Sequence, residues 1–339
     1  MILKDFLKID DLLRDYSGKS IAIVTHENPD GDGLAAAMAL YICLEQVYKA
    51  KPYIIMDSVF PSFLDFLGFN RDRVVKFSES FQSNDRSKQS NEFDLLIVLD
   101  CHEEDRIDTD KRIFSISKKV LVIDHHEAKE EHLKEEYIYY LDSSAVSTGV
   151  MIHRFLRNRI ESGEWAKDYA DCIYTTILND TDNFVNSNAK KETFSVVVEL
   201  IDLGLETHKI VNQFLNRKSI HYYKFIGKVL STIELNETHK IASFHSNLEM
   251  LKENSLTTES YSKIMRWTKG AFDVDIQVLF LEYENNDWRM GLRSEKYDVA
   301  KMAHHFGGGG HKKASGFELK GSFEDVKKTV ISFVESQIL

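Results

Sequence analysis

The side chains best suited to chemistry in this chain are acids and histidines that follow apolar runs. They fall into four short segments: His26, Asp30 and Asp32; Asp100; Asp124, His125 and His126; and Asp180 and Asp182. Carboxylate and imidazole groups in this combination are typical ligands of hard or borderline metal ions. The first hypothesis from the sequence is therefore a metal centre.

The elements that must position these side chains read as buried strands or other buried elements. They cover residues 21–24, 95–99, 120–123 and 172–178, and each is followed by one of the four segments. In an open parallel sheet, ligands bind in the crevice outside the carboxyl ends of the strands, so four such ends can converge on one point. The pattern predicts a metal-dependent α/β enzyme.

The first two segments each have a structural alternative. The loop from His26 to Asp32 is bent by proline and glycine and can turn one imidazole and two carboxylates inward, although Asp-Gly-Asp also marks plain turns. Asp100 ends a run of five apolar residues, where an uncompensated carboxylate would be costly. A nearby cation explains this acid, and helix capping is the alternative. The acids that follow the other runs favour the metal in both cases.

The third segment is more specific, because His125 and His126 are adjacent after a strand and point in different directions. One can bind metal while the other faces substrate. A lone histidine would more often be a core residue, but the triplet with Asp124 favours function. In the fourth segment, only one of Asp180 and Asp182 need reach the metals, and we choose Asp180, the earlier.

The chosen ligands exceed what one ion usually takes from side chains. They are His26, Asp30, Asp32, Asp100, His125 and Asp180. This set is enough for two ions about 3.5–4 Å apart that share a carboxylate, an arrangement that activates water and neutralises a phosphoryl group during in-line displacement. The mixed nitrogen and oxygen ligands fit Mn²⁺ best, with Mg²⁺ or Co²⁺ as substitutes.

Length and composition bound the class of protein. The chain has 339 residues, enough for two domains, and its net charge is −11. Such a surface repels a long polyanion, so we do not expect this protein to wrap a nucleic-acid duplex. A local basic patch can still hold a small phosphorylated ligand.

The cysteines and the apolar runs bear on the location of the protein. Cys43, Cys101 and Cys172 are scattered and odd in number, which predicts reduced core thiols in a cytoplasmic protein. The sequence has neither a signal-peptide core nor a membrane-spanning apolar run, so we expect no membrane association.

Strands and helices alternate to about residue 190, an order that predicts βαβ units and a parallel sheet. We expect an N-terminal parallel-sheet domain over residues 1–195, a helical connector over 196–222 and a smaller C-terminal α+β domain over 223–339. An alanine-rich helix is expected at 34–44. In the C-terminal domain we expect strands at 229–235, 240–244, 274–283, 289–292 and 316–319, and a helix at 299–306.

The C-terminal domain also contains four glycines before His311, and the central residues of this segment are Gly308, Gly309 and Gly310. Consecutive residues without Cβ let backbone N–H groups form a concave nest that receives an anion, with His311 as an added donor. A flexible hairpin turn is the alternative. A basic cluster surrounds the segment. Within this cluster, Arg293 is the residue best suited to bind a phosphate through two hydrogen bonds.

Taken together, these motifs resemble the DHH/DHHA1-family phosphoesterases across nearly the whole chain. The first four segments resemble the motifs of the catalytic DHH domain, and Gly307 to His311 resemble the glycine-rich signature of the DHHA1 domain. The resemblance implies two ions, commonly Mn²⁺, with Asp100 as a bridge. It implies a first ion held by His26, Asp30 and Asp100. It implies a second ion held by Asp32, Asp100, His125 and Asp180.

Within the family, the two-domain form is most similar to the bifunctional oligoribonucleases and pAp phosphatases. That group trims very short RNAs to mononucleotides and removes the 3′-phosphate of adenosine 3′,5′-bisphosphate (pAp). The resemblance implies catalytic roles for Asp100 and His126, with His126 on the scissile phosphate, and a remote phosphate on Arg293 and His311. Ser315 stands where many relatives would have alanine. The expected partners are short single-stranded RNA and small nucleotides, and homodimerisation is left open.

Other activities stay open at the level of sequence. Hydrolysis of linear or cyclic dinucleotides, such as pApA or c-di-AMP, is the enzymatic alternative. RecJ-type exonucleases carry further nucleic-acid-binding domains, and membrane-bound cyclic-dinucleotide phosphodiesterases carry transmembrane and sensor regions, for which this chain has no room. A nucleotide-binding module without catalysis is the alternative from another class, and retention of every matched ligand argues against it.

Overall fold

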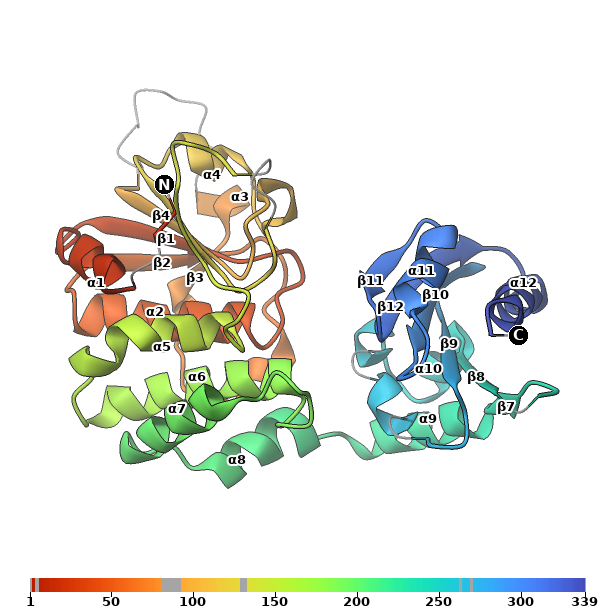
Figure 1. The fold of residues 1–339 in the computed structure, drawn as a ribbon. Coiled ribbons are helices and arrows are strands. Elements are labelled where there is room, and N and C mark those ends of the chain that lie inside the picture. The colour runs from red at the N-terminus through yellow and green to blue at the C-terminus, as the bar shows by residue number, and fades with distance from the viewer. Residues whose placement is uncertain are drawn as a thin grey trace. The chain divides into compact units, whose positions relative to one another are not determined.

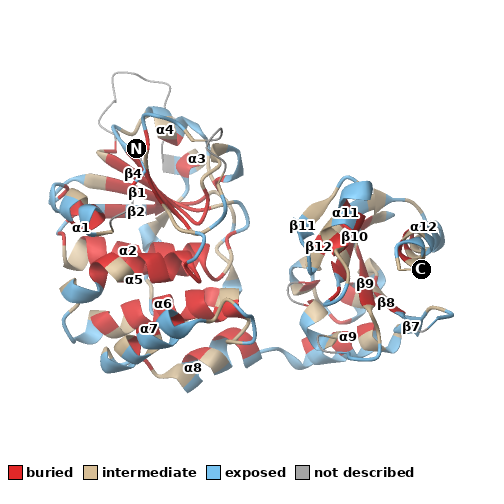
Figure 2. Ribbon diagram, in the orientation of Figure 1, coloured by how far each residue is buried: buried red, intermediate tan, exposed pale blue. Residues whose placement is uncertain are grey.

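The computed structural model of the chain describes residues 2–3, 6–80, 93–128, 133–238, 240–261, 264–268 and 271–338, and Figure 1 shows its ribbon. The chain forms two compact units, residues 1–217 and 218–339. Each unit is built on its own sheet and has its own buried core, which is red in Figure 2.

A parallel sheet of six strands forms the centre of the first unit. The strands are β1 (Ser20–Val24), β2 (Lys51–Ile55), β3 (Val74–Val75), β4 (Leu95–Leu99), β5 (Val120–Asp124) and β6 (Ile138–Leu141). They lie in the order β3-β2-β1-β4-β5-β6, and every neighbouring pair is parallel. Strands β4 and β5 are buried along their whole length, as continuous apolar runs in a parallel sheet require. The α/β class and the strands expected at 21–24, 95–99 and 120–123 are confirmed.

Helices cover this sheet, and most of them lie on one of its faces (Figure 1). They are α1 (Leu7–Arg14), α2 (Gly33–Gln46), α3 (Phe77–Ser80), α4 (Arg112–Ser115), α5 (Thr148–Leu156), α6 (Glu164–Thr181), α7 (Lys191–Asp202) and α8 (Thr207–Val211). Helix α2 contacts β1, β2 and β4 on one side and α6 on the other. Its position between two layers explains why it is apolar on all sides and why residues 34–40 are fully buried. The helix expected at 34–44 is confirmed.

The segment before Asp180, expected as a buried strand or another buried element, is a helix, so this ligand does not follow a strand. Residues 172–178 form part of the C-terminal half of α6. Their sequence is rich in β-branched and aromatic residues, a composition that favours a strand. All of them are buried, because α6 packs against α2, α5 and α7. A helix buried on every side loses the periodicity that would distinguish it from a strand.

The second unit is a mixed sheet with helices on both faces. Its strands are β7 (Glu234–Leu235), β8 (Ile241–Ser246), β9 (Ile276–Glu284), β10 (Asp287–Arg293), β11 (Gly309–His311) and β12 (Ala314–Lys320). Its helices are α9 (Ile220–Ser231), α10 (Leu248–Glu253), α11 (Val299–His305) and α12 (Phe323–Ser336). The strand order is β11-β12-β10-β9-β8-β7, in which only β8 and β9 are parallel among the described strands. The cores show that α11 and α12 cover one face and α9 and α10 the other.

Most elements expected in this unit are confirmed, and one is largely wrong. The expected strand at 229–235 begins inside helix α9, and only Glu234–Leu235 are extended. Tyr222, Phe225 and Val229 are buried at helical spacing, and they pack α9 against the sheet.

Nowhere in the described part of the chain is a helix both long and apolar enough to span a membrane.

Candidate metal centre

The candidate ligands of the first unit gather where the sheet changes its winding direction. Strands β1 and β4 are neighbours, while the chain continues from β1 to β2 on one side and from β4 to β5 on the other. The segments after β1, β4 and β5 carry His26, Asp100 and His125. Such a switch point leaves a crevice at the carboxyl ends of the strands, which is where the sequence predicts the site.

The loop after β1 places His26 and Asp30 beside Asp100. Asp30 Oδ1 accepts a hydrogen bond from the Asp32 backbone N–H at 2.8 Å and so fixes the start of α2. His26 Nδ1 lies 2.8 Å from the carbonyl oxygen of Glu27, which can only accept, so Nδ1 carries the hydrogen of this bond. His26 Nε2 faces the acids, at 3.8 Å from Asp30 Oδ1 and 3.6 Å from Asp100 Oδ2.

Asp100 lies between the two sides of the site. It has a left-handed backbone, with φ of 60°, and is only 4% exposed at the end of β4. Its Oδ2 faces His26, whereas its Oδ1 lies 3.5 Å from His125 Nε2 and accepts a hydrogen bond from Thr148 Oγ1 at 3.0 Å. A Cβ on Gly33 would lie 3.3 Å from both Asp100 and His26, so glycine keeps this approach open. The two oxygens of one carboxylate thus face different ligand groups.

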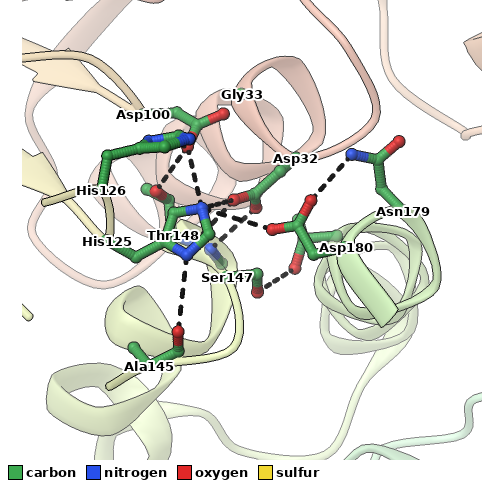
Figure 3. Close-up of polar contacts among 12 residues, drawn as sticks. Asp32, Gly33, Asp100, His125, His126, Ala145, Ser147, Thr148, Asn179 and Asp180 are labelled. Carbon is green, nitrogen blue, oxygen red and sulfur yellow. Dashed lines mark hydrogen bonds and ion pairs between the residues drawn. The ribbon is translucent and has the colours of Figure 1, made fainter. Parts of the chain in front are cut away.

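The second ligand group consists of Asp32, His125 and Asp180 (Figure 3). His125 Nε2 lies 3.5 Å from Asp32 Oδ2 and 3.4 Å from Asp180 Oδ2. His125 Nδ1 faces the carbonyl oxygen of Ala145 at 3.4 Å, which turns Nε2 toward the acids. The distances from His125 Nε2 to Asp32 and Asp180 are long for hydrogen bonds to a carboxylate. Ligand atoms this close together, one imidazole nitrogen and two carboxylate oxygens, could hold one cation.

The N-terminus of helix α5 holds the buried carboxylate of Asp32. Asp32 is 1% exposed and accepts hydrogen bonds from the backbone N–H groups of Thr148 at 2.7 Å and Gly149 at 3.2 Å. The partial positive charge at a helix N-terminus favours a carboxylate there. Gly149 lets α5 approach α6, because a Cβ on it would lie 2.1 Å from Thr176 Oγ1. Sequence reasoning missed these supporting residues, since they act through contacts between distant segments.

His126 is anchored by Asp124, a fully buried acid at the end of β5. Asp124 accepts hydrogen bonds from the His126 backbone N–H at 3.0 Å, from His126 Nδ1 at 2.8 Å and from His102 Nδ1 at 2.5 Å. The His126 side chain is 50% exposed, and its ring centre lies 4.5 Å from that of His125. With Nδ1 bonded to Asp124, Nε2 is the ring nitrogen that remains for a further contact. Sequence reasoning missed His102, whose only signal is its place two residues after Asp100.

The surroundings of the Asp180 carboxylate indicate that the site suits a cation. It lies in the last turn of α6, where Asn179 Nδ2 donates to Asp180 Oδ1 at 2.9 Å and to Asp30 Oδ2 at 2.8 Å. Asp180 Oδ2 is buried and has no hydrogen-bond partner among the described residues. A buried carboxylate oxygen without a partner is costly, and a bound cation would satisfy it. Asp182 instead ends the helix in the left-handed conformation.

Asp32 and Asp180 have raised pKa values, whereas in Asp30 burial is outweighed by the interactions with His26 and Asn179, which lower the pKa. Burial and the charges of Asp100 and Asp180 raise the pKa of Asp32 well above its usual value. Burial and the charges of Asp100 and Asp30 raise the pKa of Asp180 to about 8. Burial lowers the pKa of His26, but its interactions with Asp100 and Asp30 outweigh this effect and raise the pKa to about 10. The site therefore holds protons where divalent cations would neutralise the same negative charge.

The structure brings the six predicted ligands to one place. Among the described residues, three groups of ligand atoms each lie within 4.8 Å of one another: His26, Asp30 and Asp100; Asp32, His125 and Asp180; and Asp100, His125 and His126. The donor set is mostly oxygen with imidazole, which fits Mn²⁺ or a similar ion better than thiolate-bound zinc. Cys101 is buried, and its thiol donates to the carbonyl oxygen of Glu103 rather than facing the acids.

The residues predicted to bind a remote phosphate lie in the second unit. Arg293 ends β10 and His311 ends β11, and each pairs with Ala314 of the intervening strand β12. Directly opposed residues point to the same face of a sheet, so the two side chains share a face about 10 Å apart. Both are exposed. A phosphorylated ligand could therefore contact the Arg293 guanidinium and the His311 imidazole from one side.

The glycine segment beside them is not the loop that the sequence suggested. Gly309–His311 form the edge strand β11, which pairs with β12. A Cβ on Gly308 would lie 2.2 Å from the carbonyl oxygen of Gly316, and one on Gly310 would lie 2.7 Å from that of Ala314. Close backbone approach thus requires these glycines, in addition to the left-handed φ of 136° at Gly310.

Family models match both units of the chain. Residues 20–177 match the DHH family, N-terminal domain, and residues 245–338 match the DHHA1 domain. The matched regions contain the candidate ligands and the glycine segment, except for Asp180, which lies three residues beyond the end of the first region. The chain belongs to the DHH/DHHA1 family of phosphoesterases.

Individual relatives match most of this chain at modest identity. The bifunctional oligoribonuclease and PAP phosphatase NrnA of Thermus thermophilus is 25% identical over 302 residues, which are 89% of this chain and 84% of that protein. The cyclic-di-AMP phosphodiesterase GdpP of Bacillus subtilis is 20% identical over 94% of this chain and 48% of that protein. An exopolyphosphatase-related protein from Bacteroides fragilis has the same fold, with a TM-score of 0.83 and 22% identity over 98% of this chain and 96% of that chain.

Proposed function

We propose that this chain hydrolyses short oligoribonucleotides to mononucleotides, and pAp to AMP, at a site for two divalent ions. The observation that carries the proposal is the Asp100 carboxylate, whose oxygens lie 3.6 Å from His26 Nε2 and 3.5 Å from His125 Nε2. A carboxylate shared in this way suits a pair of ions. The relative from Thermus thermophilus, named as an oligoribonuclease and PAP phosphatase, supports the choice of substrates.

The residues that would hold the ions fall into two sets with Asp100 in common. The first set is His26, Asp30 and Asp100, and the second is Asp32, Asp100, His125 and Asp180. Mn²⁺ suits these ligands best, with Mg²⁺ or Co²⁺ as substitutes. When bound, such ions lower the pKa of a water molecule and neutralise charge on a phosphoryl group.

His126 would hold a proton at the scissile phosphate. Hydrogen bonding to Asp124 is the main cause that raises the pKa of His126 to about 9, so the imidazole is a cation at neutral pH. Asp124 occupies Nδ1, and Nε2–H can then donate to a phosphoryl oxygen. A donor fixed in this way stabilises the charge that develops on the oxygen in the transition state.

In the second unit, Arg293 and His311 would bind a phosphate that does not react. Arg293 can make a bidentate contact to phosphate oxygens, and His311 adds a donor on the same face of the sheet. The backbone of Gly308, Gly309 and Gly310 would border this phosphate. Recognition of one additional phosphate suits pAp and very short RNAs, and the net charge of −11 disfavours long strands.

A second candidate is hydrolysis of linear or cyclic dinucleotides. The likeness to the cyclic-di-AMP phosphodiesterase GdpP favours it, although the chain spans only 48% of that protein. We also propose a cytoplasmic location, supported by the three free, buried thiols of Cys43, Cys101 and Cys172.

The test is hydrolysis by the pure protein in Mn²⁺. Parallel reactions contain a 5′-labelled RNA dinucleotide, pAp and c-di-AMP, each with and without excess EDTA. The proposal predicts Mn²⁺-dependent mononucleotide from the RNA and AMP from pAp. Turnover of c-di-AMP alone would select the second candidate, and binding without turnover of any substrate would indicate a nucleotide-binding module.

A further inference from the structure

An aromatic and cationic patch lies at the start of helix α9 in the second unit. We define this patch by Lys218, Tyr223, Arg266 and Trp267, all of which are exposed. The Tyr223 ring is 43% and Trp267 44% exposed, and their ring centres lie 6.0 Å apart at an interplanar angle of 81°. Two large aromatic rings that touch at the surface do not serve the core, so their exposure needs another explanation.

The indole of Trp267 is held in place by its neighbours. Its Nε1 donates to the hydroxyl of the buried Tyr222 at 3.4 Å. The next residue, Thr268, is bonded twice to Gln277 of β9, through Thr268 Oγ1 to Oε1 and through Nε2 to the Thr268 carbonyl oxygen, both at 2.7 Å. An aromatic platform fixed in this way loses little conformational entropy when a ligand stacks on it.

The charges around the rings are positive. Residues 218–233 contain three lysines and neither Asp nor Glu, in a chain with 54 acidic residues. Lys218 Nζ lies 5.6 Å from the centre of the Tyr222 ring, and no ion pair joins it to an acid of the described residues. Partial desolvation by the aromatic cluster and the charge of Arg266 both lower the pKa of Lys218. An anion near both cations would relieve this repulsion.

The patch is connected to the predicted phosphate site within the same unit. Gln277, which holds the Trp267–Thr268 segment, pairs directly with Arg293 across β9 and β10. Opposed residues share a face of the sheet, so Arg293 emerges on the face that carries Gln277 and Thr268. A chain of nucleotides bound to Arg293 by one phosphate could therefore continue toward the two rings.

We propose that the patch is a base-stacking subsite for single-stranded RNA, in which a nucleobase stacks on Trp267 and Tyr223 and a phosphate binds between Lys218 and Arg266. The proposal rests on the proposed function and adds where the nucleotides beyond the reacting phosphate bind. Every base has a π-face, so such a site accepts RNA without regard to sequence. Cations beside the rings favour a nucleotide, whose phosphate they attract, over an apolar peptide segment.

The test measures binding without catalysis. Full-length protein in EDTA is titrated with a labelled adenine tetraribonucleotide and with an abasic tetramer that carries the same phosphates. Trp267→Ala should weaken binding of the adenine tetramer on the order of tenfold, as expected for one lost stacking partner. Trp267→Phe, which keeps a ring, should restore most of the affinity. The abasic tetramer should bind wild type and Trp267→Ala alike.

Phe272→Ala is the matched control, because Phe272 is 98% exposed and lies outside the patch. Its affinity should equal that of wild type. Equal losses for the adenine and abasic tetramers, or no loss in Trp267→Ala, would overturn the stacking subsite. Because the assay contains no metal, a protein that hydrolyses RNA but binds it independently of Trp267 refutes only this inference. A protein that binds through Trp267 but hydrolyses nothing refutes only the proposed function.

The cationic part has its own test. Lys218→Gln should reduce the slope of log K against log salt by about 0.7, the value for one phosphate contact on a single strand. Lys328→Gln is the control, since Lys328 is exposed on α12, which covers the opposite face of the sheet. An unchanged slope in Lys218→Gln, or an equal change in both variants, would remove Lys218 from the subsite.

Discussion

Asp100→Asn should abolish the response to metal while leaving the protein folded. The amide has nearly the shape of the carboxylate, but it offers one oxygen where the acid offers two. If that oxygen keeps the hydrogen bond from Thr148 Oγ1, the amide nitrogen faces His26. If the amide is turned, the nitrogen faces His125. Either way, one ligand group loses an oxygen and both groups lose a negative charge.

The expected shift in melting temperature on metal binding can be calculated from the size of the first unit. At 100 times the dissociation constant, a bound ion adds about 2.7 kcal/mol to the free energy of unfolding. The first unit has 217 residues, and a domain of that size gains about 2–4 °C per kcal/mol, which gives about 5–10 °C. If the variant binds the ion a hundredfold more weakly, the same ion concentration adds only about 0.4 kcal/mol to the free energy of unfolding, or about 1 °C to the melting temperature. In EDTA the variant should melt close to wild type, because loss of the Asp100 charge relieves its repulsion of Asp32 and Asp180 but also removes its attraction for His26.

The assay is thermal unfolding of both proteins in EDTA and in Mn²⁺, together with turnover of pAp and of an RNA dinucleotide. Loss of a ligand shared by two ions should cost at least the 10–100-fold typical of an outer-shell partner, so we expect turnover below about 1%. Asp182→Asn is the matched control, since Asp182 follows the same helix and asparagine tolerates its left-handed backbone. A variant of Asp100 with a normal Mn²⁺ shift and near-normal turnover would refute the bridging role.

Three further outcomes are expected. His126→Ala should keep the stabilisation by Mn²⁺ and lose about 10²- to 10³-fold in kcat, as for removal of one transition-state donor; loss of an ion by metal analysis would reassign His126 as a ligand. The raised pKa values of His26, about 10, and Asp180, about 8, mean that the metal-free protein loses stability as pH rises from about 4 toward 10, and that metal binding releases protons. Calorimetric titration with Mn²⁺ at pH 7 in buffers of different ionisation enthalpy measures the release, and enthalpies independent of buffer would contradict it. Arg293→Ala should mainly raise KM for pAp while the Mn²⁺ shift stays normal, and a loss confined to kcat would remove it from substrate binding.

The sequence predicted the sheet of the first unit because its signals are local. The runs at 95–99 and 120–123 are short, apolar and followed by acids, which is the pattern of central parallel strands. The sequence could not decide between a strand and helix α6 at 172–178, because these residues are buried on all sides and show no helical periodicity. In the second unit, the apolar residues at 229–235 straddle the end of α9 and the start of β7, so one run joins two elements.

The candidate ligands could be chosen from the sequence because acids after apolar runs stand out. Their supports could not, because Asn179, Thr148 and His102 are ordinary polar residues until the fold brings them to Asp180, Asp32 and Asp124. Gly33 and Gly149 are explained only by the side chains that a Cβ would meet. The aromatic patch depends on Tyr223 and Trp267, which lie 44 residues apart in sequence and meet only in the folded unit.

The central claim is that Asp100 joins two cation sites, and anomalous diffraction at the manganese edge tests it most directly. Crystals of the full chain grown with excess Mn²⁺ should give two anomalous peaks. One peak should lie among His26, Asp30 and Asp100, and the other among Asp32, Asp100, His125 and Asp180. A single peak, or two peaks of which one does not contact Asp100, would contradict the account.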